Sequence, residues 1–112
     1  MTLQGRERDG DELLALLSAL AHPIRIRIVA AVTESSTYVS QLARDLGISR
    51  PLLHMHLQKL EAAGVVVGRM EVSEDGKAMR YVEVTDFVQQ LDAATLARAA
   101  ASLRDRSKGS TT

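Results

Sequence analysis

The sequence predicts an α+β fold that is mostly helical and contains one β-hairpin. Two observations lead to this prediction. Residues 39–64 hold two short helical patterns joined by a tight turn at Gly47. After Gly64, two runs rich in β-branched residues flank Asp75-Gly76, where glycine supplies the positive φ that hairpin turns require. A chain of 112 residues fits a single domain.

Composition narrows the classes of function. The chain has no cysteine, which rules out disulfides, thiolate metal sites and sulfur redox switches. Its apolar runs are too short to span a membrane, and its first residues are polar rather than signal-like, so we expect a cytoplasmic protein with no membrane contact. No serine or histidine arrangement suggests a nucleophile with its base, and no glycine-rich loop suggests a nucleotide site. We therefore expect neither enzymatic activity nor a cofactor.

The N-terminal part combines a polar arm with a leucine-rich helix. Residues 1–10 are charged and aperiodic, which predicts a disordered arm. Residues 11–21 form a helix that is apolar over most of its circumference, with Asp11 and Glu12 at its positive N-terminal end. A helix this apolar in a short domain needs two surfaces to bury it. One is the core of the chain, and we expect the other to be a second subunit.

The next segment is ambiguous between helix and strand. His22 precedes Pro23 and is most simply a helix-cap residue, since proline suits a first helical turn. Residues 24–28 alternate like a half-buried strand, yet residues 28–32 extend a helical face. The proline start and the length favour a helix. Residues 33–37 then predict a loop, and residues 38–39 a short extended segment.

Residues 39–64 predict a helix-turn-helix. Ser40 and Ser49 are placed to cap the two helices, and Gly47 occupies the left-handed position that ends the first. Pro51 fits the first turn of the second helix. Leu53, Leu57 and Leu60 then form one buried stripe. An ordinary helical hairpin fits the same pattern, but in a helix-turn-helix the second helix can enter the major groove of DNA.

The hairpin that follows makes this motif a winged helix-turn-helix. Residues 65–72 and 78–84 are the predicted strands of a two-stranded wing, joined by the turn at residues 73–77. Thr85 is placed to cap a last helix that runs to about residue 103, and Asp86 lies in the first turn of that helix. Residues 105–112 predict a flexible tail, so the folded domain spans residues 11–104.

Candidate DNA contacts lie on the outward face of the second motif helix and on the wing. Arg50 is at the start of that helix, where side chains reach base edges, and Lys77 flanks the wing tip, where it can meet phosphate. Arg80 is evenly balanced between a DNA contact and a solvated charge, and Lys59 and Arg69 are expected to be peripheral. The full candidate set is Ser49, Arg50, Pro51, Leu52, His54, Met55, Gln58, Lys59, Lys77 and Arg80.

Particular motifs in this order resemble the ArsR/SmtB family of winged helix-turn-helix repressors. They are AHPIRIRIV, VSQLARDLGIS, SRPLLHMHLQKLEAAGVV and EVSEDGKAMRYVEV, and the resemblance covers roughly residues 11–100. It implies a homodimer that pairs through its first and last helices, binds an inverted repeat in double-stranded DNA and blocks transcription. The candidate dimer contacts are Leu13, Leu14, Leu17, Phe87, Leu91 and Ala94.

The metal-sensing residues of that family do not carry over. The first motif helix has no cysteine pair, and the last helix has no histidine beside Asp86 and Asp92, which lie too far apart to share a helical face. His54 and His56 diverge on one helix, and His56 is expected to be a packed, hydrogen-bonded structural residue. We predict no metal site, and the effector, a small molecule or a protein if there is one, stays unknown.

The predicted function is a dimeric, sequence-specific DNA-binding repressor that metals do not regulate. A formal net charge of zero counts mildly against this, because nucleic-acid-binding domains are usually basic. The alternative is a winged-helix protein-interaction module without DNA binding. From Arg44 to Arg80 there are six arginines or lysines and five acids, and Glu74 and Asp75 sit together in the predicted turn, so local geometry can leave the recognition face positive.

Overall fold

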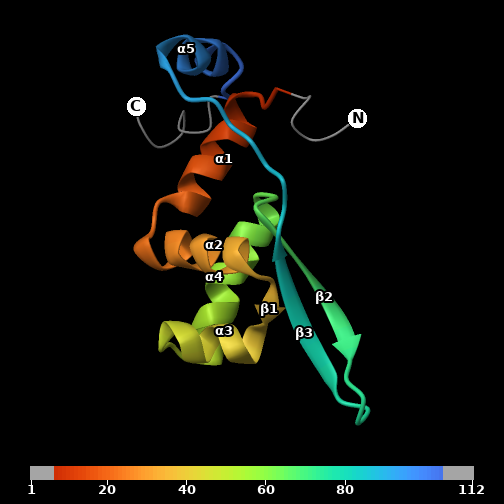
Figure 1. Ribbon diagram of the computed structural model, residues 1–112. Helices are drawn as coiled ribbons and strands as arrows, with labels where there is room; N and C mark the ends of the chain where they lie inside the picture. The colour runs from red at the N-terminus through yellow and green to blue at the C-terminus, as the bar shows by residue number, and fades with distance from the viewer. Residues whose placement is uncertain (1–6, 105–112) are drawn as a thin grey trace.

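The computed structural model describes residues 7–104, which form five helices and three strands (Figure 1). Three strands form one antiparallel sheet in the order β1-β3-β2. The elements are α1 Gly10–Leu20, α2 Pro23–Glu34, β1 Thr37–Tyr38, α3 Val39–Leu46, α4 Arg50–Ala62, β2 Val66–Val72, β3 Ala78–Val84 and α5 Ala93–Ala101. The predicted α+β winged helix-turn-helix is therefore confirmed.

The segment after Pro23 is a helix, as the proline start favoured. His22 Nδ1 accepts a hydrogen bond of 3.1 Å from the amide of Ile24, so its predicted role as a cap is confirmed. Ile28 and Val32, four residues apart, are buried, whereas Ile26 is 58% exposed. The alternation of apolar residues at 24–28 therefore does not mark a strand, because the segment is a helix that buries one face with a period of about 3.6 residues. The predicted loop starts later, after Glu34.

Helix α1 begins at Gly10, one residue earlier than predicted, and Asp9 caps it. The carboxylate of Asp9 accepts from the amide of Glu12 at 2.8 Å, and Glu12 returns a hydrogen bond to the amide of Asp9, which is a capping box. Arg8 donates to Val88 O and Gln89 Oε1, both at 2.9 Å. Residues 7–10 are thus part of the folded structure rather than of the predicted arm. The rest of that arm, residues 1–6, and the predicted tail, residues 105–112, lie outside the described residues.

The helix-turn-helix follows its predicted capping in the second helix but not in the first. Gly47 has a φ of 70° and ends α3, and the Ser49 hydroxyl accepts from the amide of Leu52 at 3.2 Å. The expected cap at Ser40 is wrong: β1 runs directly into the helix, Tyr38 is at the cap position, and no side chain caps it. Ser40 lies inside the first turn. The side chains of Leu53, Leu57 and Leu60 are fully buried, as their spacing predicted.

The wing belongs to a three-stranded sheet rather than to a two-stranded one. β2 and β3 pair from Val66↔Val84 to Val72↔Ala78, and Gly76 in the turn has a φ of 87°. β1 adds to the free edge of β3, with Thr37↔Val82 and Tyr38↔Tyr81 as partners. This third strand joins the entry of the helix-turn-helix to the base of the wing. The two parts of the motif are therefore held in one sheet.

The last helix starts at Ala93, so the prediction that it begins at Thr85 is wrong. The Thr85 hydroxyl donates to the carbonyls of Gly64 at 2.7 Å and Val65 at 3.0 Å, which ties the end of β3 to the start of β2. Asp92 caps the helix instead, accepting from the amide and the hydroxyl of Thr95 at 2.8 and 2.7 Å. These bonds lower the pKa of the Asp92 carboxyl to about 2. Residues 85–92 are an irregular connection.

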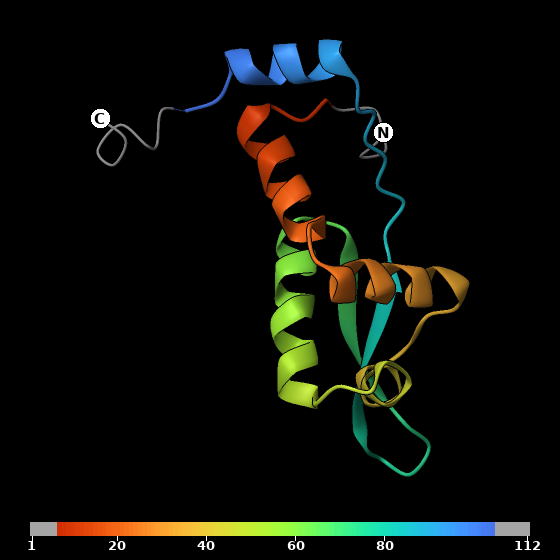
Figure 2. The same cartoon turned by 90° about the vertical axis from the view of Figure 1, so that its left-hand side faces the viewer.

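The core lies between the second half of α1, the helices α2, α3 and α4, and the sheet. Its largest fully buried side chains are Leu16, Ile28, Leu42, Leu53, Leu57, Leu60, Val65 and Val82. From this body α1 projects to one end of the molecule, where α5 lies across its first turn (Figure 2). Among residues 7–104 no single helix is long and apolar enough to cross a membrane; α1 and α2 meet the criterion only as a pair, bent by 90° at their junction.

Candidate nucleic-acid interface

The first half of α4 presents an exposed face of polar, basic and sulfur-containing side chains. Arg50 opens the helix, and Leu53, His56, Leu57 and Leu60 turn inward, so the other side of the helix faces outward. Leu52 is half-buried. The other predicted contacts of this segment are exposed, and they are Ser49, Arg50, Pro51, His54, Met55, Gln58 and Lys59. In the sequence, the nearest acidic residues are Asp45 before this segment and Glu61 after it.

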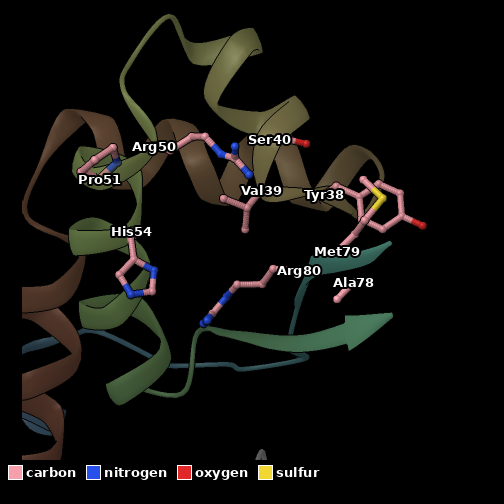
Figure 3. A pocket seen from close by; sticks show the side chains of 9 residues that line it. All are labelled: Tyr38, Val39, Ser40, Arg50, Pro51, His54, Ala78, Met79 and Arg80. Atoms are coloured by element: carbon pink, nitrogen blue, oxygen red, sulfur yellow. The ribbon is translucent and has the colours of Figure 1, made fainter. Parts of the chain in front are cut away.

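This face borders a hollow that also reaches the sheet. The hollow has a volume of about 520 Å³ and separates the start of α4 from β3 and from the junction of β1 with α3. Arg50 and His54 project into it from the α4 side, and Arg80 enters it from β3 (Figure 3). Its nine lining residues are Tyr38, Val39, Ser40, Arg50, Pro51, His54, Ala78, Met79 and Arg80. No acid is among them, so an anion entering here meets only neutral or basic groups.

The wing tip is a tight turn organised by Ser73. Its backbone carbonyl accepts from the Gly76 amide at 2.9 Å, and its hydroxyl accepts from the Lys77 amide at 3.1 Å. The same hydroxyl donates to the Asp75 carboxylate, and this bond holds the pKa of that carboxyl below its usual value. The Lys77 side chain is exposed and has no hydrogen-bond or ion-pair partner within residues 7–104. The turn therefore presents one free ammonium group.

Ion pairs change the charge balance around these side chains. Arg69 lies 3.1 Å from Glu71 and 2.5 Å from Glu83, with its guanidinium 4.6 Å from the centre of the Tyr81 ring. Glu61 pairs with Arg80 at 2.6 Å. Glu61, Glu71 and Glu83 are thus each ion-paired with an arginine. Within the described residues Arg50, Lys59 and Lys77 have no ion-pair partner, and neither do Asp45, Glu74 and Asp75. The outward face of α4 therefore keeps two unpaired cations, whereas the wing tip carries charges of both signs.

A buried histidine supports α4 from behind. His56 is 2% exposed, and its Nδ1 accepts a hydrogen bond of 3.0 Å from Arg25 Nε. The His22 ring lies 4.6 Å from the His56 ring, centre to centre. Burial, and then the charges of His22 and Arg25, lower the pKa of His56. The predicted structural role of His56 is confirmed, and Arg25, which also donates to Ala19 O at 3.4 Å, joins α2 to α4.

Comparison with known proteins agrees with this architecture. Residues 22–67 match the model of the family described as "Bacterial regulatory protein, arsR family". An uncharacterised HTH-type transcriptional regulator of Methanocaldococcus jannaschii is 31% identical over 81 residues, which cover 72% of this chain and 84% of that protein. The chain belongs to the ArsR family. The match to the family model contains α2, β1, α3, α4 and the start of the wing.

Other relatives of this ArsR-family protein are named as repressors. The biofilm growth-associated repressor of Xylella fastidiosa strain Temecula1 is 31% identical over 74 residues, which are 66% of this chain and 65% of that protein. The crystal structure of the transcriptional repressor BigR from Xylella fastidiosa superposes with a TM-score of 0.56 at 25% identity, covering 81% of this chain and 79% of that one. A homodimeric winged helix-turn-helix domain from Mycobacterium bovis has the same fold, with a TM-score of 0.60, 23% identity, and coverage of 66% of this chain and 64% of that chain.

The six predicted dimer contacts of the ArsR-family chain fall into two groups. Leu13 is 3% exposed, Leu17 is half-buried, and Phe87 packs against the core of its own protomer. Leu14 and Leu91 are each 55% exposed, and Ala94 is exposed as well. Val88, Leu96 and Leu103 add exposed apolar surface at the same end and are absent from the predicted contact set. Their exposure depends on where α5 begins, which the sequence pattern misplaced.

The structure also locates the remaining metal-ligand candidates of this ArsR-family chain. Asp92 is engaged in capping α5, and His22 accepts from a backbone amide. Among residues 7–104, no group of three or more histidine, aspartate or glutamate side chains is placed to hold a metal ion.

Proposed function

We propose that this chain is a sequence-specific double-stranded DNA-binding transcriptional regulator that acts as a dimeric repressor at an inverted-repeat operator. One observation carries the proposal: the start of α4, free of acids and exposed, lies at the same end of the molecule as the wing tip with its unpaired Lys77 (Figure 2). A recognition helix and a wing on one side match the shape of a groove flanked by phosphates. Relatives named as repressors support the regulatory role.

The proposed contacts divide by chemistry. Arg50 donates two parallel hydrogen bonds to guanine, and Met55 contacts a thymine methyl group in the same groove. Lys77 neutralises a phosphate beside the groove. The remaining contacts position the helix against the backbone and the neighbouring bases, and they are Ser49, Pro51, Leu52, His54, Gln58 and Lys59.

Dimerisation is part of the proposal. Leu14 is on α1, Ala94 is on α5 and Leu91 comes just before α5. These helices lie at the end of the molecule opposite the wing (Figure 2), where a second copy covers them without obstructing DNA. The Mycobacterium bovis structure, which is described as homodimeric, has the same fold and supports a dimer. A two-fold axis there presents two α4 helices to successive major grooves, about 34–36 Å apart.

We further propose that the protein works in the cytoplasm without catalysis and without a metal cofactor. A regulator of this class needs only two states, one that binds the operator and one that does not. A small molecule or another protein that binds one state better than the other regulates it.

Selection from a random pool of double-stranded DNA by the purified full chain tests the proposal. The expected result is enrichment of an inverted repeat with half-sites about 10–10.5 bp apart, centre to centre. Fluorescence anisotropy should then give a Kd for that site well below the Kd for random DNA, with a steep dependence on salt. Enrichment of no sequence, with only weak and uniform binding, would contradict the proposal and favour a protein-interaction module.

A further inference from the structure

A short ion pair joins the last turn of α4 to the middle of β3. Arg80 Nη2 lies 2.6 Å from Glu61 Oε2, and the two side chains are 34% and 26% exposed. A charge-assisted bond of this length is among the stronger hydrogen bonds in proteins, and partial burial protects it from screening by salt. The pair therefore connects the recognition helix directly to the strand that carries the wing tip.

Gly68 on β2 leaves the room that this pair occupies. A Cβ added at Gly68 would lie 2.8 Å from Glu61 Oε2 and 3.3 Å from Arg80 Nη2. The positive-φ glycines of the described chain are Gly47, Gly64 and Gly76, so Gly68 is needed for space rather than for its backbone conformation. A side chain at this position would push the carboxylate away from the guanidinium.

The rest of the Arg80 side chain is also turned inward. Its Nε is buried and has no hydrogen-bond partner within residues 7–104. The side chain runs from β3 toward α4 along the floor of the hollow, rather than outward along the wing (Figure 3). An arginine that binds phosphate needs free donors facing solvent. In Arg80, Nη2 instead donates to the Glu61 carboxylate, and Nε is buried.

We propose that Arg80 is a positioning residue for DNA binding. Held by Glu61 in the space beside Gly68, it sets the angle of the wing against α4, so that Lys77 meets phosphate when Arg50 is in the groove. Lys77 is three residues before Arg80, at the tip end of β3, so a shift of the strand at Arg80 moves the ammonium group with it. This inference rests on the proposed DNA-binding function.

Glu61→Gln distinguishes positioning from direct contact by the sign of its effect. If Arg80 touched DNA, removal of the competing acid would free its guanidinium and strengthen binding to the selected double-stranded site. If Arg80 positions the wing, the same change weakens binding, roughly tenfold for a coupled pair of this kind. Gly68→Ala should weaken binding in the same direction with little change in thermal midpoint, because the atoms that have to move belong to the long side chains of Glu61 and Arg80 rather than to the backbone.

Glu83→Gln is the matched control. It removes an equal charge from the neighbouring ion pair with Arg69, on the sheet, without touching the link to α4. Its Kd for the selected site should equal that of the wild type. An equal loss in Glu83→Gln and Glu61→Gln would mean that breaking either ion pair of the sheet has the same effect, with no special role for the link to α4, and would overturn the proposal.

Two further variants test whether the pair acts through Lys77. Combining Glu61→Gln with Lys77→Ala should weaken binding less than the product of the two single effects, since a displaced wing has already lost the Lys77 contact. Exchange of the two charges, Glu61→Arg with Arg80→Glu, should restore affinity toward the wild-type value. Unchanged or tighter binding by Glu61→Gln overturns the inference, whereas failure of the wild-type chain to select any DNA overturns the proposed function itself.

Discussion

Arg25 Nε donates a hydrogen bond of 3.0 Å to Nδ1 of the buried His56, and this bond requires His56 to be neutral. An imidazolium would carry a proton on Nδ1 and face the positive charge of Arg25 at the same distance. His56 lies on α4 and Arg25 on α2, so the bond helps to hold the recognition helix on the body of the domain. The protonation state of one histidine is therefore linked to the stability of this packing.

The first prediction concerns pH. The pKa of His56 lies below its ordinary value of 6.5 because burial disfavours the charged form, and His22 and Arg25 add to this effect. Its contribution to stability is thus complete above pH 6.5 and is lost as the pH falls from 6.5 toward the lower folded-state pKa. Chemical denaturation of His56→Gln should show a weaker loss of stability on acidification than the wild type. The exposed His54 supplies the control: His54→Gln should keep the wild-type pH dependence.

The second prediction concerns the junction of α1 and α5. A Cβ on Gly10 would lie 2.1 Å from the backbone oxygen of Ala99 and 2.9 Å from Leu103 Cγ. Gly10→Ala gains at most about 1 kcal/mol of helix propensity, but overpacking against backbone costs about 1–3 kcal/mol. Hydrogen exchange should become faster in residues 93–101 and stay unchanged in residues 50–62. Ser18→Ala, at an exposed position of the same helix, should change neither; protection of α5 that survives in Gly10→Ala would refute this account.

The third prediction concerns the dimer. Leu14 and Leu91 are each 55% exposed in the protomer, so a charge there should leave the protomer folded but oppose burial in an interface. Sedimentation velocity at micromolar concentration should find a dimer for the wild type and a monomer for Leu14→Glu and Leu91→Glu. Val72→Glu, at a wing position that is 74% exposed, should remain dimeric. A wild-type monomer at this concentration would contradict the dimer.

The fourth prediction concerns metals. The sequence has no cysteine, and within residues 7–104 no cluster of three candidate ligands forms. Stoichiometric zinc, nickel, cadmium or arsenite should leave the affinity of the protein for its selected DNA site unchanged. A tenfold change that a chelator reverses would mean that a metal site exists.

The elements that could be predicted from the sequence are those whose signals are local. Gly47, Ser49 and Pro51 lie next to the helix ends that they determine, and Gly76 lies in the turn that it allows. The start of α5 could not be found in this way. Threonine is a common helix-cap residue, but the Thr85 hydroxyl instead donates to carbonyls about twenty residues earlier in the chain.

The same distinction holds for the candidate interface. The outward face of α4 follows from helical spacing, because the buried leucines determine which side faces solvent. The partner of Arg80 does not, since Glu61 comes within reach only after α4, β2 and β3 have packed. The short strand β1 and the close approach of Gly10 to Ala99 also depend on contacts between distant segments. Such contacts leave no periodic pattern in the sequence.

Binding of Arg50→Ala and Lys77→Ala to the selected site and to random DNA tests the central claim most directly. A bidentate arginine–guanine pair is worth about 1–3 kcal/mol of discrimination, so Arg50→Ala should lose affinity for the selected site while its binding to random DNA changes little. Lys77→Ala should weaken both and flatten the salt dependence by roughly one counterion per half-site. Equal loss on both DNAs for both variants would contradict base reading by Arg50, and no loss in either would contradict the placement of the interface on α4 and the wing.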